Sequence, residues 1–501
     1  MALQRVMNTV AAAIRGSGIR WFAGAVLFVF ALALTVAVAV AGGEARGTGR
    51  PNVLLVLVDD LGSRDVRSEG SLFHETPHLD ALAQGSARFR NGYSSHPVCS
   101  PTRAALQTGK VPQRLGITDW IAAGTGVALP AAELTLGEAF RAAGYQTAYL
   151  GKWHLGEADA DQPDRHGYEW TRGVNRAGQP ASYYAPFRQT QPTNRLWDVP
   201  DFATRRDGEY LTDVLTEAAI EFLRQRDVGR PFLMCVSHYA VHTPLQPPGG
   251  QARLQEERRR TRYGSSVTPV VPASSEAVTR ARQDDPVYAA MVENLDANLG
   301  RLLAALDELG LSRNTVVVFT SDNGGLSTLV GTRPGPTCNL PWRAGKGWTY
   351  EGGIRVPLWI RWPGTISPGD RDTPAVTADL YPTLLELCGL PLRPSQHVDG
   401  ASLVSALEGT PNRRLRTRSL AWFYPHRHGS GHVPGAALRR GSWKLVYSLQ
   451  GGATELYDLE ADPGETRDLA RDHPRRTRAL LKELRRWIAE TQLQDARGMG
   501  W

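Results

Sequence analysis

Three nearly unbroken apolar runs, each followed directly by polar residues, constrain what this chain can fold into. They span residues 53–58, 231–236 and 315–320. Runs of this length without polar alternation are typical of strands that are buried on both faces of a parallel sheet. A weaker strand pattern spans 145–150, and helix-like segments separate the runs. Strands that alternate with helices over residues 51–390 predict a mostly parallel sheet with helices on both faces.

The residues that follow these strands are polar and carry candidate chemistry. Ligands of parallel sheets bind at the carboxyl ends of the strands, so we expect side chains that follow different strands to meet at one edge. Three carboxylates and an amide among them are hard oxygen ligands, which suit calcium or magnesium better than zinc. The residues expected at this edge are Asp59, Asp60, Lys152, His154, His238, His242, Asp322 and Asn323.

A short motif after the first run, Cys99-Ser-Pro-Thr-Arg103, precedes a small, apolar and helix-forming stretch. Pro101 fits the first turn of a helix, where a missing N–H is no loss. A cysteine at such a helix start lies at the positive end of the helix dipole, which favours a reactive thiol. The four cysteines of the chain are far apart in the sequence. They suggest neither a zinc knuckle nor a disulfide framework.

The motif of Cys99, together with Asp59-Asp60 and the run from Asp322 to Gly325, resembles the sulfatase family over residues 51–469. The resemblance implies an alkaline-phosphatase-like α/β/α sandwich with a large mixed, mostly parallel sheet, plus a small C-terminal α+β domain with an antiparallel sheet. It also implies that a maturase oxidises Cys99 to formylglycine and that one calcium ion is the cofactor. The residues that match the family's metal ligands are Asp59, Asp60, Cys99, Asp322 and Asn323.

The resemblance further implies an arylsulfatase-like enzyme that hydrolyses sulfate esters. The hydrate of formylglycine would be the nucleophile, and nearby cations would offset charge on the sulfonate oxygens. His154 would accept a proton from the hydrate, and His242 or Lys346 would donate one to the leaving alcohol. The residues that match the family's active-site bases and cations are Arg103, Lys152, His154, His242 and Lys346. Together with Cys99 they are the predicted catalytic residues.

The loops around the site predict a sulfated sugar as substrate, because they are rich in groups that stack on sugars or hydrogen-bond to them. Their aromatic members are Trp120, Trp153 and Trp348. Residues 423–429 look like the segment with which related sulfatases reach over the pocket. Basic loops would also attract a polyanionic glycan. The residues predicted to bind substrate are His238, Asn339, Arg343, His426 and His428.

Two other functions stay open at this point. A phosphomonoester, phosphodiester or phosphonate hydrolase of the same superfamily would share the metal site, since sulfate and phosphate have similar shapes. An envelope protein that binds sulfated glycans without catalysis would leave Cys99 unoxidised. The net charge of +7 favours anionic partners, although it also fits a generally arginine-rich composition. Nucleic acid is not expected as a partner, because no basic motif is interleaved with aromatic residues.

Residues 1–41 are predicted to be a targeting segment. Arginines precede a long uncharged run, and residues 39–41 have the small-x-small form of a signal-peptidase site. Cleavage would release the protein to the periplasm or the cell exterior, whereas an uncleaved run is long enough to anchor it in a membrane. The remaining chain is predicted to divide into a catalytic domain, 50–412, and a small domain, 413–501.

Two further stretches carry expectations that depend on local pattern alone. Residues 76–89 resemble one capped helix, with Pro77 in its first turn. Residues 249–285 are charged and rich in serine and proline, without a clear period. We expect this stretch to be an irregular surface insertion.

Overall fold

The computed structural model describes residues 49–188, 195–410 and 412–491. Its internal contacts separate Met1–Arg50 from Pro51–Trp501, and the description below concerns the second unit. The predicted targeting segment, 1–41, lies outside the described residues. Within the described ranges, no helix is both long enough and apolar enough to cross a membrane.

The centre of the structure is an eight-stranded sheet with the strand order β12-β2-β11-β9-β1-β6-β4-β5. Its inner strands pair in parallel, β9 with β1, β1 with β6 and β6 with β4, whereas β11 runs antiparallel to β9 and to β2. The large mixed, mostly parallel sheet that was predicted is therefore confirmed. The strands are β1 (Asn52–Val58), β2 (Ala87–Phe89), β4 (Gln146–Gly151), β5 (Trp170–Arg172), β6 (Phe232–Ser237), β9 (Thr315–Ser321), β11 (Leu358–Arg361) and β12 (Gly369–Arg371).

The register of the inner strands brings their carboxyl ends level. Val58 of β1 is paired with Ser321 of β9, and Gly151 of β4 is paired with Ser237 of β6. Leu57 is in turn paired with Ser237. The next residue of each strand therefore emerges at the same edge of the sheet.

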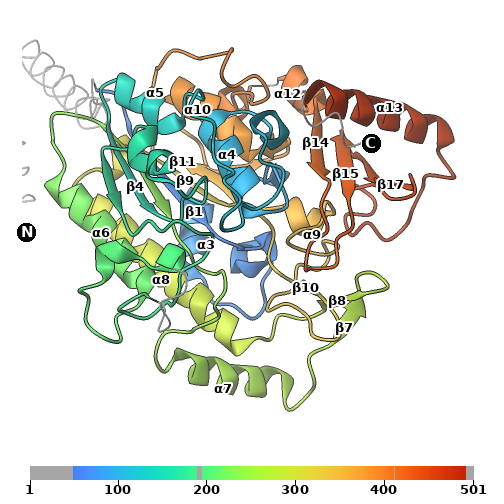
Figure 1. Cartoon of the computed structure of the whole chain (residues 1–501), viewed down its shortest axis with the longest axis horizontal. Coiled ribbons are helices and arrows are strands. Elements are labelled where there is room, and N and C mark those ends of the chain that lie inside the picture. Colours follow the sequence, from blue (N-terminus) through green and yellow to red (C-terminus); the bar gives the residue numbers. More distant parts are fainter. Residues whose placement is uncertain (1–48, 189–194, 411, 492–501) are drawn as a thin grey trace, which may run out of the picture. The chain divides into compact units, whose positions relative to one another are not determined.

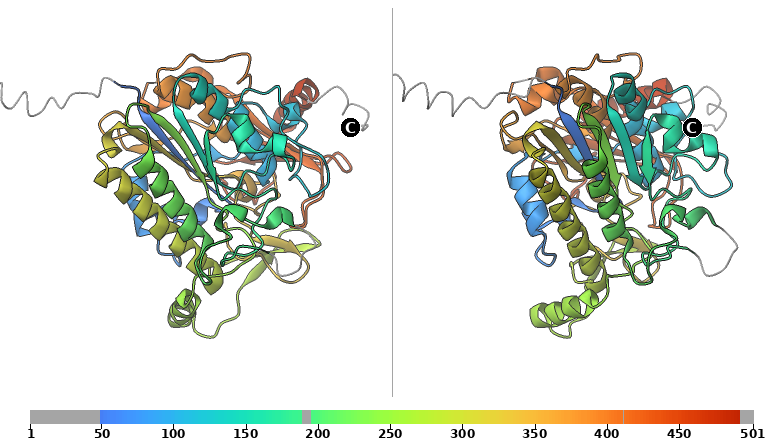
Figure 2. Two further views of the ribbon diagram at one scale, coloured as in Figure 1. Left: turned by 60° about the vertical axis from the view of Figure 1, so that its left-hand side comes forward. Right: turned by 90° about the vertical axis from the view of Figure 1, so that its left-hand side faces the viewer.

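Helices cover both faces of the sheet because alternate residues of each buried strand point to opposite sides. Leu54 and Val56 pack with α3 (Pro77–Gln84), α6 (Leu211–Gln225) and α8 (Pro286–Glu308). Figures 1 and 2 show α6 and α8 side by side across this face. The opposite face carries Val53, Leu55 and Leu57, and it packs with α4 (Cys99–Thr108), α5 (Leu136–Ala142) and α10 (Leu380–Leu387).

The single helix predicted over 76–89 is wrong in its second half. Helix α3 ends at Gln84, and Gly85 caps it. Residues 87–89 then form β2, which lies between β11 and β12 in the sheet. Burial of Ala87 and Phe89 in the core favours the strand there, and tertiary packing overrides the local helical pattern.

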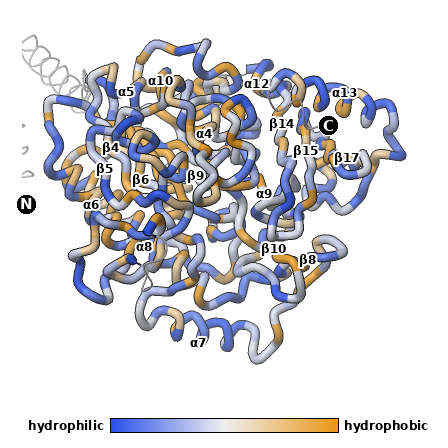
Figure 3. The backbone as a smooth tube through the Cα atoms, in the orientation of Figure 1, coloured by the Kyte–Doolittle hydropathy of each residue, from blue (hydrophilic) through white to orange (hydrophobic). Residues whose placement is uncertain are grey.

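The stretch 249–285 is more regular than predicted. It forms α7 (Gln251–Tyr263), β7 (Val270–Pro272) and β8 (Ala277–Arg280), and β8 also pairs with β10 (Thr328–Val330). Figure 3 shows α7 as mostly hydrophilic, in contrast to the hydrophobic central strands. Charged contacts hold it instead of an apolar face, among them the pair of Arg258 with Glu293 on α8. A hydrophobic period could not reveal such a helix.

A second, four-stranded antiparallel sheet follows near the C-terminus. It has the order β14-β15-β16-β17, and α13 (Pro474–Thr491) packs against it through Leu480, Leu484 and Ile488. The antiparallel sheet predicted for the C-terminal part of the chain is therefore present, while the domain boundary near 412 stays a prediction. The strands are β14 (Ser419–Tyr424), β15 (Gly435–Arg440), β16 (Trp443–Ser448) and β17 (Thr454–Asp458). The remaining short elements are β3 (Gly92–Tyr93), β13 (Ala375–Val376), α9 (Glu351–Ile354), α11 (Val404–Leu407) and α12 (Arg413–Thr417).

Candidate active site

Cys99 is the first residue of α4, and its side chain is buried against His154. The Sγ atom lies 3.3 Å from Nδ1 of His154, while Nε2 of the same ring lies 2.9 Å from the carbonyl oxygen of Ile121. The carbonyl can only accept, so Nε2 carries the hydrogen and Nδ1 presents a lone pair to the side chain of residue 99. Burial, reinforced by Lys152, lowers the pKa of His154 well below its usual value. A neutral base therefore faces Cys99.

Arg103 lies one helical turn after Cys99 and ties α4 to the strand ends. Its Nε donates to Asp322 at 2.8 Å, and its Nη1 donates to the carbonyl oxygen of Lys152 at 2.6 Å and to Oγ of Ser237 at 2.7 Å. Burial opposes the charge of the guanidinium, but Asp322 and Asp59 outweigh burial and raise the pKa of Arg103. This buried cation fixes the orientation of the helix that carries Cys99.

Asp59 and Asp60 lie at the carboxyl end of β1, and each is paired with a lysine. Lys152 Nζ lies 2.6 Å from Oδ2 of Asp59, and Lys346 Nζ lies 2.7 Å from Oδ1 of Asp60. Asn323 donates to Asp60 through Nδ2 at 2.8 Å. Burial alone would raise the pKa of Asp60, but Lys346 and nearby His242 lower it below the usual value.

Two oxygen atoms of this cluster have no hydrogen-bond donor among the described residues. They are Oδ1 of Asp59 and Oδ1 of Asn323, both buried. Burial raises the pKa of Asp59 well above its usual value despite the pairing with Lys152. Buried acceptors without donors are costly unless a cation satisfies them. The donor set of carboxylate and amide oxygens fits a hard divalent cation such as calcium.

His242 completes the only group of three potential ligands found among the described residues, together with Asp59 and Asp60. Its Nδ1 lies 2.9 Å from the carbonyl oxygen of Thr243, so Nε2 is free of hydrogen when the ring is neutral. Burial and the charge of Lys346 lower the pKa of His242 to about 3. Nε2 lies 3.7 Å from Oδ2 of Asp60, and it is therefore an acceptor that faces the carboxylate cluster.

A cavity of about 610 Å³ opens above these residues. Cys99, His154, His242 and Lys346 are part of its lining. The remaining lining residues are Trp120, Ile121, Ala123, Glu157, Ala177, Gly178, Gln179, Trp197, Arg427, His428 and Gly429. The structure thus brings one base, one thiol and a lysine together at the floor of one cavity, with aromatic residues on its walls.

Four of the five residues predicted to bind substrate do not line this cavity, and His428 alone does. Asn339 is buried, and its Nδ2 donates to the carbonyl oxygens of Gly325 and Ala344. His238 is buried, and Nδ1 of its ring has no hydrogen-bond partner among the described residues, while Nε2 of His426 lies 2.9 Å from Oγ1 of Thr118.

Arg343 also lies outside the lining of this cavity, and its contacts are with residues of the C-terminal sheet and of the loop before it. Its guanidinium lies 3.8 Å from the ring centre of Tyr350, and Nη1 donates to the hydroxyl of Tyr457 at 2.8 Å. Trp153 and Trp348 are buried as well, and each indole N–H is bonded to a protein oxygen. Each of these side chains is thus held by other groups of the protein.

Sequence reasoning missed Trp197, Gln179, Glu157 and Arg427 as cavity residues. The first three lie in a polar stretch without any period, so no local signal marks them. Arg427 stands between the two histidines that were singled out in 423–429, and charge alone could have suggested it.

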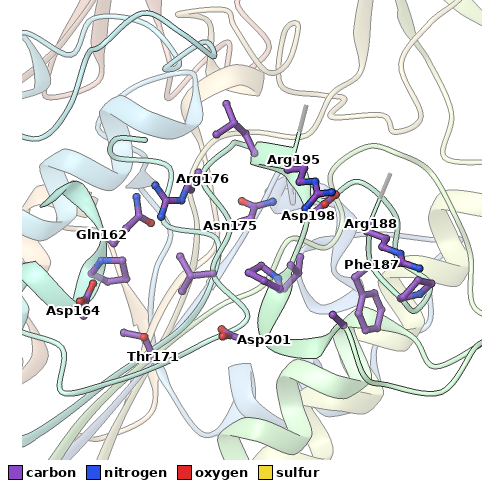
Figure 4. A pocket seen from close by; sticks show the side chains of 17 residues that line it. Gln162, Asp164, Thr171, Asn175, Arg176, Phe187, Arg188, Arg195, Asp198 and Asp201 are labelled. Atoms are coloured by element: carbon purple, nitrogen blue, oxygen red, sulfur yellow. The ribbon is translucent and has the colours of Figure 1, made fainter. Parts of the chain in front are cut away.

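Figure 4 shows a larger cavity, of about 860 Å³. Asn175 and Arg176 line it, whereas the neighbouring Ala177 and Gly178 line the smaller cavity. Arg195, Asp198 and the other charged residues of the larger cavity include neither a base next to a nucleophile nor a carboxylate cluster. We therefore place the active site in the smaller cavity.

Comparisons with known proteins agree with this site. The family model described as Sulfatase matches residues 51–390, and a second model, N-sulphoglucosamine sulphohydrolase, C-terminal, matches 343–494. Human arylsulfatase A is 33% identical over 84% of this chain and 83% of its own length. The N-acetylgalactosamine-6-sulfatase of Canis lupus familiaris is 32% identical over 73% of this chain and 68% of its own length.

A solved structure supports the fold assignment. The crystal structure of Ps i-CgsB in complex with k-i-k-neocarrahexaose has a TM-score of 0.74, with 26% identity, over 88% of this chain and 94% of that chain. The resemblance drawn from the motifs of Cys99, Asp59 and Asp322 is thereby confirmed. Because the matched relatives are named as enzymes, the non-catalytic alternative is not supported. The chain belongs to the sulfatase family and is a sulfatase, an enzyme that hydrolyses sulfate esters.

Proposed function

We propose that this sulfatase is an exported enzyme that acts on sulfated carbohydrates, with Cys99 oxidised to formylglycine and one calcium ion as cofactor. The contact between His154 and Cys99 is the observation that supports the proposal most directly. A base with its lone pair 3.3 Å from the thiol is placed to take a proton from whatever hydroxyl replaces that sulfur. A cysteine that served packing alone would have no need of a neutral imidazole at this position.

Calcium would be held by Asp59, Asp60, Asp322 and Asn323, where it would supply positive charge for the sulfate oxygens. The charges of the chain support this assignment. Three carboxylates in the cluster face three cations, Arg103, Lys152 and Lys346. A divalent cation would leave a positive surplus, which suits an anionic ester.

Residues of the chain itself carry out the remaining steps of the reaction. Formylglycine supplies the nucleophile as its hydrate. Arg103 fixes the helix that carries residue 99, and His154 receives its proton at Nδ1. Lys346 and Lys152 offset charge on the sulfonate oxygens, and Lys346 donates a proton to the leaving alcohol, since Nε2 of the neutral His242 can only accept one. Burial of Arg103, Lys152, His154 and Lys346 strengthens their electrostatic contacts.

The walls of the cavity support a sugar as the group that carries the sulfate. Trp120 is 46% exposed at the cavity wall, and Trp197 also lines the cavity. Exposed aromatic faces suit the C–H faces of sugar rings, while Gln179 and Arg427 offer hydrogen bonds. The comparison structure of Ps i-CgsB is a complex with k-i-k-neocarrahexaose, which is consistent with a carbohydrate substrate for this chain.

Arg427→Gln and His428→Ala should each lower kcat/KM for a sulfated saccharide by about tenfold, equal to ~1.4 kcal/mol of transition-state binding. An aryl group has no hydroxyl groups that could bond to these residues, so its turnover should change little. The measurement compares kcat/KM for sulfated mono- and disaccharides with that for an aryl sulfate, and for the phosphate esters of the same alcohols.

His426→Ala is the matched control, because His426 neighbours these residues but does not line the cavity. It should leave both activities near the wild-type level. Equal losses on saccharide and aryl substrates would remove the case for a sugar. Faster turnover of the phosphate esters would favour the phosphohydrolase alternative.

We propose export on the basis of residues 1–41, which end in a small-x-small sequence before Gly42. Protein recovered from the culture medium or the periplasm should begin near Gly42. N-terminal sequencing measures this directly. An exported chain that still begins at Met1 would identify the segment as a membrane anchor.

A further inference from the structure

One buried carboxylate, Glu465, connects the region of the C-terminal sheet to the loop that carries Lys346. Its Oε2 accepts a hydrogen bond from the backbone N–H of Glu351 at 2.7 Å. Its Oε1 lies 2.8 Å from Nζ of Lys444 on β16, and the same Nζ lies 2.9 Å from Oε1 of Glu351. All three side chains are fully buried. The opposite charges of such a buried cluster hold its members in one arrangement.

Glu351 is the first residue of α9, the short helix that closes this loop. Its N-cap, Tyr350, makes no side-chain capping bond. The first N–H groups of a helix need acceptors from elsewhere. Glu465 supplies one of them from a position 114 residues later in the chain.

The loop between Arg343 and α9 is packed too tightly to move in parts. The N–H of Gly324 donates to the carbonyl oxygen of Gly353 at 3.0 Å, and the N–H of Lys346 donates to Gly325 at 3.1 Å. A Cβ atom on Gly353 would lie 2.0 Å from the carbonyl oxygen of Trp348. A displacement at the start of α9 would therefore reach both Lys346 and the residue that follows Asn323.

The same loop also touches the segment that leads into Cys99. The N–H of Gly347, next to Lys346, donates to the carbonyl oxygen of Pro97 at 2.8 Å. Lys346 itself extends to Asp60, with Nζ 2.7 Å from Oδ1. The loop thus joins the lysine, the carboxylate cluster and the start of α4.

The backbone conformation of Glu465 also indicates that this residue is held in one position. Its φ of 52° lies in the left-handed region, which a residue with a side chain rarely adopts. Such a conformation persists only where the surroundings enforce it. Here Arg343 donates through Nη1 to the carbonyl oxygen of Glu465 at 3.3 Å, while the carboxylate is held by Lys444 and Glu351.

We infer that Glu465 is a positioning residue for the sulfatase reaction. By accepting a hydrogen bond from the first N–H of α9, it fixes the position of Lys346, although Glu465 itself lies outside the central sheet. The inference rests on the proposed role of Lys346 at the sulfonate oxygens. It predicts that loss of the carboxylate weakens catalysis more than substrate binding, since Glu465 touches neither the cavity nor the substrate.

The test is steady-state kinetics of Glu465→Ala and Glu465→Gln in the full chain, with a chromogenic aryl sulfate. Glu465→Ala should lower kcat by about tenfold to a hundredfold with little change in KM, because a displacement near 1 Å can cost about 10²-fold. Glu465→Gln keeps an oxygen for the N–H of Glu351 and should recover most of the activity. Glu460→Ala, an exposed residue of the same segment, is the matched control.

A double-mutant cycle separates positioning from general damage. In a Lys346→Met background, Glu465→Ala should cause a much smaller loss of kcat than it causes in the wild-type background. Independent losses that add would overturn the inference, as would a Glu465→Gln variant as impaired as Glu465→Ala although both melt like the wild type. If Glu465→Ala does not fold, Glu465→Asp carries the cycle, because its shorter side chain withdraws the carboxylate from the N–H of Glu351. Should Lys346→Met alone leave kcat unchanged, the proposed role of Lys346 fails first, and the inference fails with it.

Discussion

Replacing Cys99 with alanine should abolish sulfatase activity, with a loss of kcat of about 10⁶-fold, as for other enzymes that lose their nucleophile. The proposed mechanism depends on an aldehyde at this position, and the thiol of Cys99 marks where its side chain lies. His154 would then face a methyl group and have no proton to accept. Cys99→Ser should be almost as inactive, because a single hydroxyl cannot re-form a carbonyl when sulfate leaves.

The oxidation of Cys99 can be measured independently of activity. Peptide mass spectrometry, combined with a hydrazide reagent that labels aldehydes, should find formylglycine in protein made by a host with a maturase. Cys338→Ala is the matched control, since Cys338 is also buried and free but lies outside the cavity. Active enzyme in which residue 99 is entirely a free thiol would contradict the mechanism.

The sequence was sufficient for the sheet and for the floor of the site, for one physical reason. Strands such as β1 and β9 are buried on both faces, so their apolar runs are visible without any alignment. Parallel pairing then makes the residue after each run a candidate, as Asp59, Lys152 and Asp322 show. The side chains of these residues converge because the strands are in register, and the ends of the apolar runs in the sequence already indicate that register.

The walls of the site could not be predicted in the same way. Asn339 and Arg343 have the side chains of sugar-binding residues and lie in a glycine-rich loop, yet both satisfy protein groups. Whether a polar side chain in a loop faces a ligand or a carbonyl depends on contacts with distant segments. Trp197 shows the converse, a cavity residue in a stretch without any pattern. For the same reason α7, which is held by charge pairs, escaped a search for apolar periods.

Removal of the metal should inactivate the enzyme, and calcium should restore it and stabilise the fold. A ligand present at a hundred times its Kd stabilises a protein by about 2.7 kcal/mol, which corresponds to a rise of a few degrees in Tm. Oδ1 of Asp59 and Oδ1 of Asn323 are buried and have no hydrogen-bond donor among the described residues, so this stabilisation is specific to a cation. Thermal unfolding of the chelated protein, with and without added calcium, measures the shift without reference to activity.

Asp322→Asn should remove both effects of calcium, because it takes one charge from the ligand set while preserving shape. The variant should lose activity by about 10²- to 10³-fold, the cost of removing one group that stabilises the transition state, and its Tm should respond little to calcium. Its buried partner Arg103 would lose its closest carboxylate, so the basal Tm should fall as well. Asp399→Asn breaks another arginine pair, with Arg114, and this control should keep the full response to calcium. Stoichiometric zinc in the purified enzyme, together with a failure of calcium to restore the chelated protein, would refute the assignment, since zinc prefers nitrogen and sulfur ligands to this set of oxygens.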